Sequence, residues 1–215
     1  MRNKYVAFIA DGILSGVMLC IGCAVNLSVE LRPLGAFLFS LGLFVIIRLK
    51  FGLYTGKAGY MAVRPLRYVC EVILTLAGNI IGAAAGGALL NITRFSEMFS
   101  NGAGDILIDK LSDSYLSVFV LAFFCGILMF VAVEGNRRAL ASGDSVGGLF
   151  AVVIPVMAFI LCGFNHSIAD LSYFFINGCE NAQKAVPYFM LVIIGNAAGC
   201  MLIPCLKRLV HGEMF

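Results

Sequence analysis

One histidine in this sequence lies inside a long apolar region, close to a carboxylate and to hydroxyl groups. It is His166, within the stretch Cys162-Gly-Phe-Asn-His-Ser167, and Asp170 follows it. Histidine can gain or lose a proton near neutrality, because its unperturbed pKa is ~6.5. Thr55, in an earlier interruption of an apolar run, could add a second hydroxyl donor besides that of Ser167. Together these groups could relay a proton or bind a small anion.

The composition excludes a water-soluble fold. The chain has 215 residues, of which 61% are hydrophobic and 13% charged, and its mean hydropathy is +0.98. Soluble domains carry roughly 25% charged residues. The net charge of +3 is small, and no basic stretch is interleaved with aromatic residues, so nucleic acid is not expected as a partner. The expected surroundings are the lipid bilayer.

Six apolar segments predict six transmembrane helices in a single membrane domain that covers residues 1–215. A span needs ~20 mostly apolar residues, so six spans would take about 120 residues and leave short connections. The expected spans are 6–31, a run from 34 to 47, 66–90, 115–133, a run from 146 to about 162, and 187–206. A polar loop is expected between the halves, over residues 91–114.

The second and fifth spans are interrupted at matching positions, over residues 48–56 and 162–167. In many channels and transporters such a pair marks the solute site, because irregular backbone at membrane depth is tolerated only inside protein or beside water. The N-termini of half-helices also carry free N–H groups that favour anions. The two breaks therefore favour a solute pathway between them.

The two halves of the chain repeat each other weakly. Gly78–Gly82 and Gly195–Gly199 share the pattern Gly-Asn-x-x-Gly, whose small residues let helices approach closely. Three spans in each half predict an inverted 3+3 repeat, because an odd number forces opposite orientations. With six spans, nine Lys and Arg residues, Arg2 among them, fall on the side of the termini and four on the other. The positive-inside rule then predicts that both termini are cytoplasmic.

The ionisable groups leave alternatives open. His166 could line the pathway, which the second broken span favours, or it could be a buried neutral ring that bonds a backbone carbonyl. Asp170 could be the partner of His166 or a helix-start anion that faces solvent. Arg48 and Lys50 are expected to extend toward the membrane surface rather than to contact the solute.

Several stretches resemble the formate/nitrite transporter family. The run 34–44 followed by Leu53-Tyr-Thr-Gly56 is similar to the family's second helix and Ω loop. Gly163-Phe-Asn-His-Ser-Ile-Ala-Asp170 resembles its fifth-helix signature, Gly-Phe-Glu-His-Ser-Ile-Ala-Asn. Residues 125–133 are similar to its fourth-helix motif, and the two Gly-Asn-x-x-Gly pieces match helices three and six. The resemblance covers nearly the whole chain.

This resemblance implies an all-α, aquaporin-like fold with broken second and fifth helices, assembled as a homopentamer in a bacterial cytoplasmic (inner) membrane. It implies a channel or transporter for a small monovalent anion such as formate, nitrite or hydrosulfide, often moved with a proton. We expect no enzymatic activity, cofactor or metal. Aligned with the family, the pathway residues are His166, Thr55, Lys110, Asn165 and Ser167, and the constriction residues are Phe39, Leu43 and Phe159.

Three positions depart from the family pattern. Asn165 replaces a glutamate, Asp170 replaces an asparagine, and Gly126 replaces the fourth-helix asparagine. A carboxylate has in effect moved to the other side of His166. The departures bear on the choice of substrate.

The expected mechanism avoids moving a bare anion through an apolar ring, because removing it from water costs many kcal/mol. Lys110 would attract the anion electrostatically, and His166 would donate or relay a proton, so that the neutral weak acid passes. An aquaporin-like channel for a small neutral solute is the alternative, although its paired Asn-Pro-Ala loops are absent from this sequence. A membrane thiol oxidoreductase would need a convergent cysteine pair, and Cys20 and Cys23 are an i, i+3 pair within a span.

Overall fold

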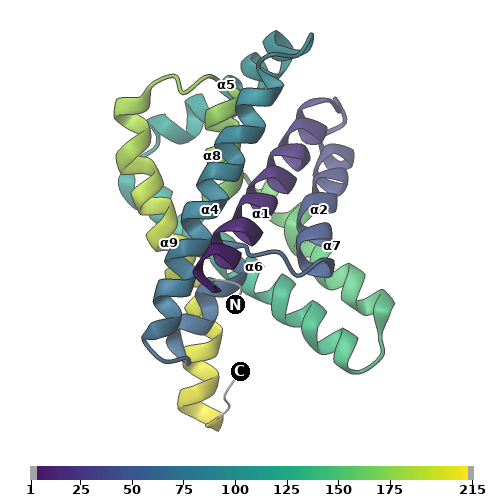
Figure 1. Cartoon of the computed structure of the whole chain (residues 1–215), viewed down its shortest axis with the longest axis vertical. Coiled ribbons are helices and arrows are strands. Elements are labelled where there is room, and N and C mark those ends of the chain that lie inside the picture. The colour runs from purple at the N-terminus through teal and green to yellow at the C-terminus, as the bar shows by residue number, and fades with distance from the viewer. Residues whose placement is uncertain (1–3, 213–215) are drawn as a thin grey trace.

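The computed structural model describes residues 4–212, so that Arg2 lies outside the described part. The described residues form α-helices and one 3-10 helix, with no strand among them (Figure 1). In chain order the elements are α1 (Lys4–Leu27), α2 (Arg32–Arg48), α3 (Tyr54–Ala58), η1 (Gly59–Ala62), α4 (Arg67–Leu90), α5 (Ser96–Ser112), α6 (Tyr115–Ala141), α7 (Ser145–Leu161), α8 (Ser167–Ile176) and α9 (Ala182–His211).

Among the described residues, four helices are long and apolar enough to cross a membrane, namely α1, α4, α6 and α9. They pack as two pairs, α1 with α4 and α6 with α9. Glycines make this close approach possible: a Cβ on Gly82 would overlap the carbonyl oxygen of Ile13, and a Cβ on Gly199 would overlap that of Phe123. Both glycines belong to the Gly-Asn-x-x-Gly pieces, so the close packing expected from these motifs is confirmed.

The remaining apolar segments are divided into shorter helices. Residues 49–53 separate α2 from α3, and residues 162–166 separate α7 from α8. Both gaps are narrower than the sequence indicated, because a first helical turn closes earlier. The N–H of Lys57 donates to the carbonyl of Leu53, which places Thr55 inside α3, and Ser167 is the first residue of α8.

The expectation of a loop over residues 91–114 was wrong, because α5 occupies most of that segment. Phe99, Ala103 and Leu107 recur every fourth residue and are buried on one face of this helix. The helix packs mainly against α8. This docking brings Lys110, near the end of α5, to the interior of the protein.

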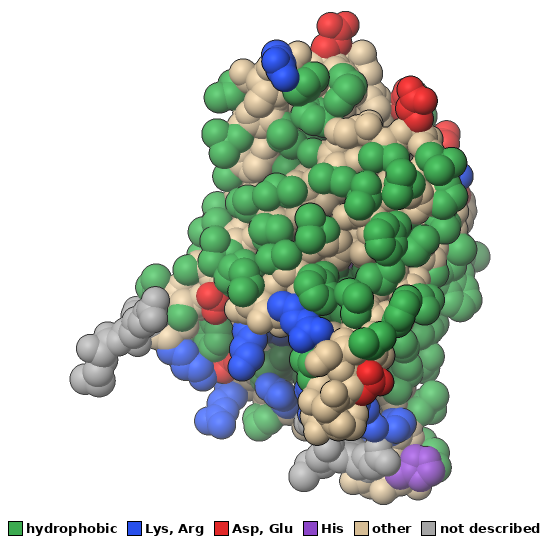
Figure 2. All heavy atoms as spheres, turned by 90° about the vertical axis from the view of Figure 1, so that its right-hand side faces the viewer, with side chains coloured by type: hydrophobic (Ala, Val, Ile, Leu, Met, Phe, Trp, Pro, Cys, Tyr) green, Lys and Arg blue, Asp and Glu red, His purple; other side chains and the backbone are tan. Residues whose placement is uncertain are grey.

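The molecular surface has the distribution expected for a membrane protein. A broad area of hydrophobic side chains covers the middle of the molecule in Figure 2. Acidic side chains stand above this area, and most of the Lys and Arg side chains in view gather below it. In Figure 1, α1 begins in the lower half of the molecule and α9 ends at its bottom. The chain is therefore a multi-pass membrane protein with a basic end on the side of its termini.

Candidate functional site

The N-terminal ends of α3 and α8 meet in the interior of the protein. Thr55, in the first turn of α3, has its Oγ1 atom 3.1 Å from Nε2 of His166, which immediately precedes α8. Both residues are buried, and 111 positions separate them in the sequence. The two breaks thus bring together the two polar residues singled out from the sequence.

Asn79 of α4 fixes the first break. Its Oδ1 atom accepts a hydrogen bond from the N–H of Tyr54 at 2.8 Å, which satisfies a free donor at the start of α3. Its Nδ2 atom donates to the carbonyls of Gly12 at 2.9 Å and Gly52 at 2.8 Å. One buried side chain therefore ties the gap to both α1 and α3.

Asn196 of α9 fixes the second break in the same way. Its Oδ1 atom accepts from the N–H of Ser167 at 2.8 Å, at the start of α8. Its Nδ2 atom donates to the carbonyls of Ala122 at 2.8 Å and Asn165 at 2.9 Å. Both asparagines belong to the Gly-Asn-x-x-Gly pieces, so the repeat in the sequence corresponds to a repeated set of hydrogen bonds.

The hydrogen bonds of His166 define its tautomer. Nδ1 accepts from the backbone N–H of Ala169 at 3.1 Å, so that His166 caps α8. Because a backbone N–H can only donate, Nδ1 carries no proton, and the proton of the neutral ring is on Nε2. Nε2–H then donates to Thr55 Oγ1. The hydroxyl proton of Thr55 is left to donate to another group.

Two of the expected constriction residues touch each other beside His166. The rings of Phe39 and Phe159 meet edge to face with centroids 5.8 Å apart. Phe159 in turn stacks on His166 at 5.4 Å. Leu43 is one turn after Phe39 on α2 and is equally buried. The ring of Phe159 therefore lies directly against His166, and Phe39, Leu43 and Phe159 are together called the apolar layer.

A cavity lies on each side of this layer. The cavity nearer α5, here called the α5 vestibule, has a volume of about 430 Å³ and is lined by 14 residues that include Phe39, Phe159, Lys110 and Asp170. The opposite cavity, here called the lower pocket, has a volume of about 180 Å³ and is lined by residues that include Leu43. The two cavities share no lining residue, and the apolar layer contributes Phe39 and Phe159 to the first and Leu43 to the second.

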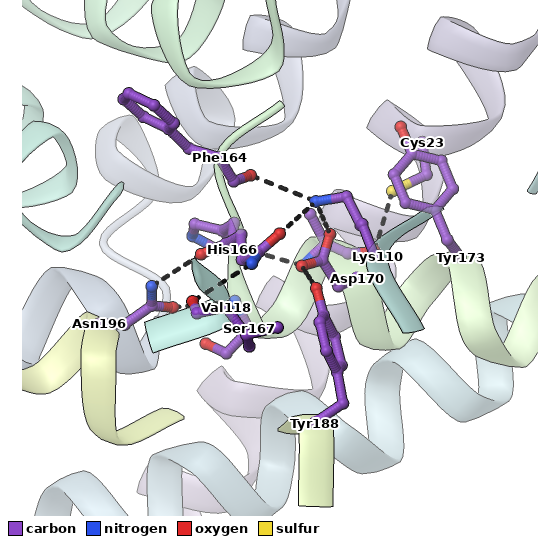
Figure 3. A network of polar contacts seen from close by, with 12 residues as sticks. Cys23, Lys110, Val118, Phe164, His166, Ser167, Asp170, Tyr173, Tyr188 and Asn196 are labelled. Atoms are coloured by element: carbon purple, nitrogen blue, oxygen red, sulfur yellow. Dashed lines mark hydrogen bonds and ion pairs between the residues drawn. The ribbon is translucent and has the colours of Figure 1, made fainter. Parts of the chain in front are cut away.

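Lys110 is held by three oxygen atoms (Figure 3). Its Nζ atom is 3.0 Å from Asp170 Oδ1, 3.0 Å from Asn165 Oδ1 and 3.3 Å from the carbonyl oxygen of Phe164. Asp170 is 2% exposed, and its Oδ2 atom accepts from the hydroxyl of Tyr188 at 2.7 Å. Both sequence-based interpretations of Asp170 were therefore wrong: it neither pairs with His166 nor faces solvent.

The two neighbours of His166 in the sequence, Asn165 and Ser167, differ in their hydrogen bonding. Asn165 bridges two elements, because it accepts from Lys110 and donates through Nδ2 to the carbonyl of Val118 at 3.3 Å. The Ser167 hydroxyl is fully buried and has no hydrogen-bond partner within the described residues. It is thus the polar group next to His166 that could accept or donate a bond to a passing solute or water.

Sequence reasoning missed the roles of Asn79 and Asn196. Both were noted only as parts of small-residue helix contacts. The signal that could have revealed them is the asparagine itself, because a buried amide in an apolar span needs partners, and a broken helix supplies free backbone groups. The ion pair of Lys110 with Asp170 was also missed, because the helix that carries Lys110 was taken for a loop.

Comparisons with known proteins agree with this architecture. The sequence model of the formate/nitrite transporter family matches residues 1–209. A formate channel of Bacillus thuringiensis is 24% identical over 220 residues, which cover 89% of this chain and 83% of that protein. A formate-nitrite transporter of Plasmodium malariae is 30% identical over 115 residues, or 49% of this chain and 36% of that protein.

Solved structures share the fold. A pentameric formate channel with formate bound superposes with a TM-score of 0.79, covering 99% of this chain and 100% of that one. The sequence identity is 20%, so the likeness shows the fold alone. This confirms the all-α membrane fold expected from the sequence.

Proposed function

Because the chain belongs to the formate/nitrite transporter family, we propose that it forms a pore that moves a small monovalent anion, such as formate, together with a proton. Its relatives are described as transporters and channels, not as enzymes. The solute crosses the narrow part as the neutral weak acid. The α2–α3 and α7–α8 segments serve as two broken spans, so that six spans form a single membrane domain.

The observation that carries this proposal is the contact between the apolar layer and the polar pair. Phe39 and Phe159 close the path on one side, and His166 stacks on Phe159 while bonding Thr55. A bare anion entering this layer would lose its water without gaining a counter-charge, which costs several kcal/mol or more. A neutral acid of a few atoms loses far less. It can exchange its hydrogen bonds with water for bonds to the Thr55 hydroxyl.

The geometry favours a positioning role for His166. A neutral imidazole is a poor acid, so donating a proton would first require protonation of Nδ1. Nδ1 already accepts the N–H of Ala169, and this bond would be lost. We infer that His166 orients the Thr55 hydroxyl toward the solute, and that the solute has already gained its proton when it enters the α5 vestibule. A relay through the ring, expected from the sequence, remains the competing version of the same function.

The proposed assembly is a homopentamer with both termini in the cytoplasm. The formate channel of similar fold is described as pentameric. The basic lower end of the molecule, on the side of the termini, is the end that the positive-inside rule assigns to the cytoplasm (Figure 2). The α5 vestibule then opens to the outside, and the lower pocket opens to the cytoplasm. A bacterial cytoplasmic membrane fits this arrangement.

The test is uptake by proteoliposomes that contain the purified protein. Formate, nitrite, hydrosulfide and lactate are supplied one at a time over a pH series, with protein-free liposomes as the control. We expect formate uptake to rise as the external pH falls, because the neutral fraction of a weak acid grows about tenfold per pH unit above its pKa. Uptake of glycerol or urea without uptake of any weak acid would instead identify a channel for neutral solutes.

A further inference from the structure

We propose that Asp170 is a specificity-determining residue, whose carboxylate masks the ammonium group of Lys110 and so disfavours free anions in the α5 vestibule. This inference rests on the proposed function and concerns the form of the solute that the vestibule admits. Lys110 was expected to attract anions. Its effect on an anion depends on the groups that already surround it.

The ammonium group of Lys110 has no N–H left for a solute. It carries three N–H donors, and three oxygen acceptors lie within 3.3 Å of Nζ, one each from Asp170, Asn165 and Phe164. Two of these acceptors are neutral, and the third supplies a full opposite charge. A solute anion would have to displace one of them.

The Lys110–Asp170 ion pair is buried enough for its net charge to affect a solute in the vestibule. The side chains of Lys110 and Asp170 are 14% and 3% exposed. Electrostatic interactions at such sites are screened less than at the surface. The hydroxyl of Tyr188 donates to the second carboxylate oxygen of Asp170. The Lys110–Asp170 pair is therefore close to neutral as seen by an approaching solute.

The rest of the vestibule does not restore a positive field. Its lining contains two basic residues, Arg32 and Lys110, and three acidic residues, Asp105, Asp109 and Asp170. The Arg32 guanidinium is 3.4 Å from the carbonyl oxygen of Leu161. Among the residues that line the vestibule, the acidic groups outnumber the basic ones by three to two. Such a vestibule repels a free anion but has no comparable effect on a neutral acid.

The experiment compares two solutes at one fixed pH. Nitrate, the anion of a strong acid, reports the path for free anions, and formate reports the weak-acid path. In proteoliposomes, Asp170→Asn should raise the ratio of nitrate flux to formate flux roughly tenfold, because it removes a charge next to Lys110 while keeping the shape. Glu97→Gln is the matched control, since it removes the same charge from an exposed position of α5 that does not line the vestibule. This control should keep the ratio of nitrate flux to formate flux within about twofold of the wild-type ratio.

A second pair of variants tests the masking directly. Lys110→Gln leaves the Asp170 carboxylate without its cation, so nitrate flux relative to formate should fall below that of the wild type. Adding Asp170→Asn to Lys110→Gln should restore the wild-type ratio. This arm decides the question even if Asp170→Asn alone does not fold.

The outcomes separate this inference from the proposed function. Wild-type formate uptake with an unchanged nitrate ratio in folded Asp170→Asn would overturn the inference alone. The inference alone would also be overturned if the double variant kept the low ratio of nitrate flux to formate flux of Lys110→Gln. A wild-type protein that carries no weak acid would overturn the proposed function, and the inference with it.

Discussion

The hydroxyl oxygen of Thr55 lies 3.1 Å from Nε2 of His166, although the two residues belong to opposite halves of the chain. Each stands where a half-helix begins, and each half-helix is tied down by an asparagine, Asn79 or Asn196. The polar contact is thus placed by the repeat itself. We propose that this geometry makes Thr55 the donor toward the solute and His166 the residue that orients it.

Removing either member of this pair should slow transport. We expect Thr55→Val and His166→Gln each to lower formate flux by about 10- to 100-fold, because a lost hydrogen bond to a desolvated solute costs about 1–3 kcal/mol. The rise of flux at low pH should persist in both variants, since the solute gains its proton before it reaches this pair. Initial rates of formate uptake over a pH series measure both effects.

His166→Gln also distinguishes positioning from relay. If the imidazole carries the proton, this variant should lose the pH dependence that Thr55→Val retains. That difference between the two variants would contradict a positioning role. Ser28→Ala is the control for changes that leave the pathway intact, because it removes an exposed hydroxyl that directly follows α1 and donates to the carbonyl of Ala24.

The apolar layer should decide which solutes are excluded. We expect Phe39→Ala to admit free anions such as nitrate, because it removes the ring that meets Phe159 edge to face. Phe37→Ala on the same helix is the control, since Phe37 is 48% exposed whereas Phe39 is 1% exposed. Electrical conductance of planar bilayers with nitrate measures the effect. An unaltered nitrate conductance in Phe39→Ala would place the constriction elsewhere.

The asparagines of the two halves should contribute equally to stability. Asn196→Leu leaves the Ser167 N–H and the carbonyls of Ala122 and Asn165 without this partner, which should cost at least about 3 kcal/mol. Asn79→Leu should have a similar effect. Melting temperatures in detergent measure both, and Asn101→Leu on the exposed face of α5 is the control. Equal melting temperatures for all three variants would contradict the conclusion that Asn79 and Asn196 hold the two helix breaks in place.

The helix pairs should not tolerate a methyl group at their contacts. Gly199→Ala places its Cβ against the carbonyl oxygen of Phe123, so α6 and α9 must move apart. We expect loss of the folded protein or a strongly reduced melting temperature. Gly102→Ala, whose Cβ meets only the flexible side chain of Leu27, should remain close to the wild type. Similar yields and stabilities of the two variants would contradict the close packing.

Much of the fold could be predicted because apolar runs are a strong signal. The shortage of charged residues indicated a membrane protein, and the Gly-Asn-x-x-Gly pieces indicated two tight helix pairs. The breaks before Thr55 and His166 were also visible, since polar residues interrupt otherwise apolar segments. Their limits were set too widely, because hydropathy does not show where the first turn of a half-helix closes.

The polar network could not be predicted, because its partners come from distant elements. Nothing near Lys110 in the sequence indicates that it pairs with Asp170, or that Tyr188 donates to that carboxylate. The helix α5 was missed because its mean hydropathy is low and its buried face has only one apolar residue per turn: Phe99, Ala103 and Leu107. Since that helix was taken for a loop, only the family resemblance placed Lys110 in the pathway.

The most direct test of the account is the number of protons that cross with each formate. Formate uptake and internal pH should be followed together in proteoliposomes, with the membrane potential recorded by a dye. We expect one proton to enter per formate and no potential to develop, because the solute crosses as the neutral acid. Formate entry that generates a potential and leaves the internal pH unchanged would contradict the account.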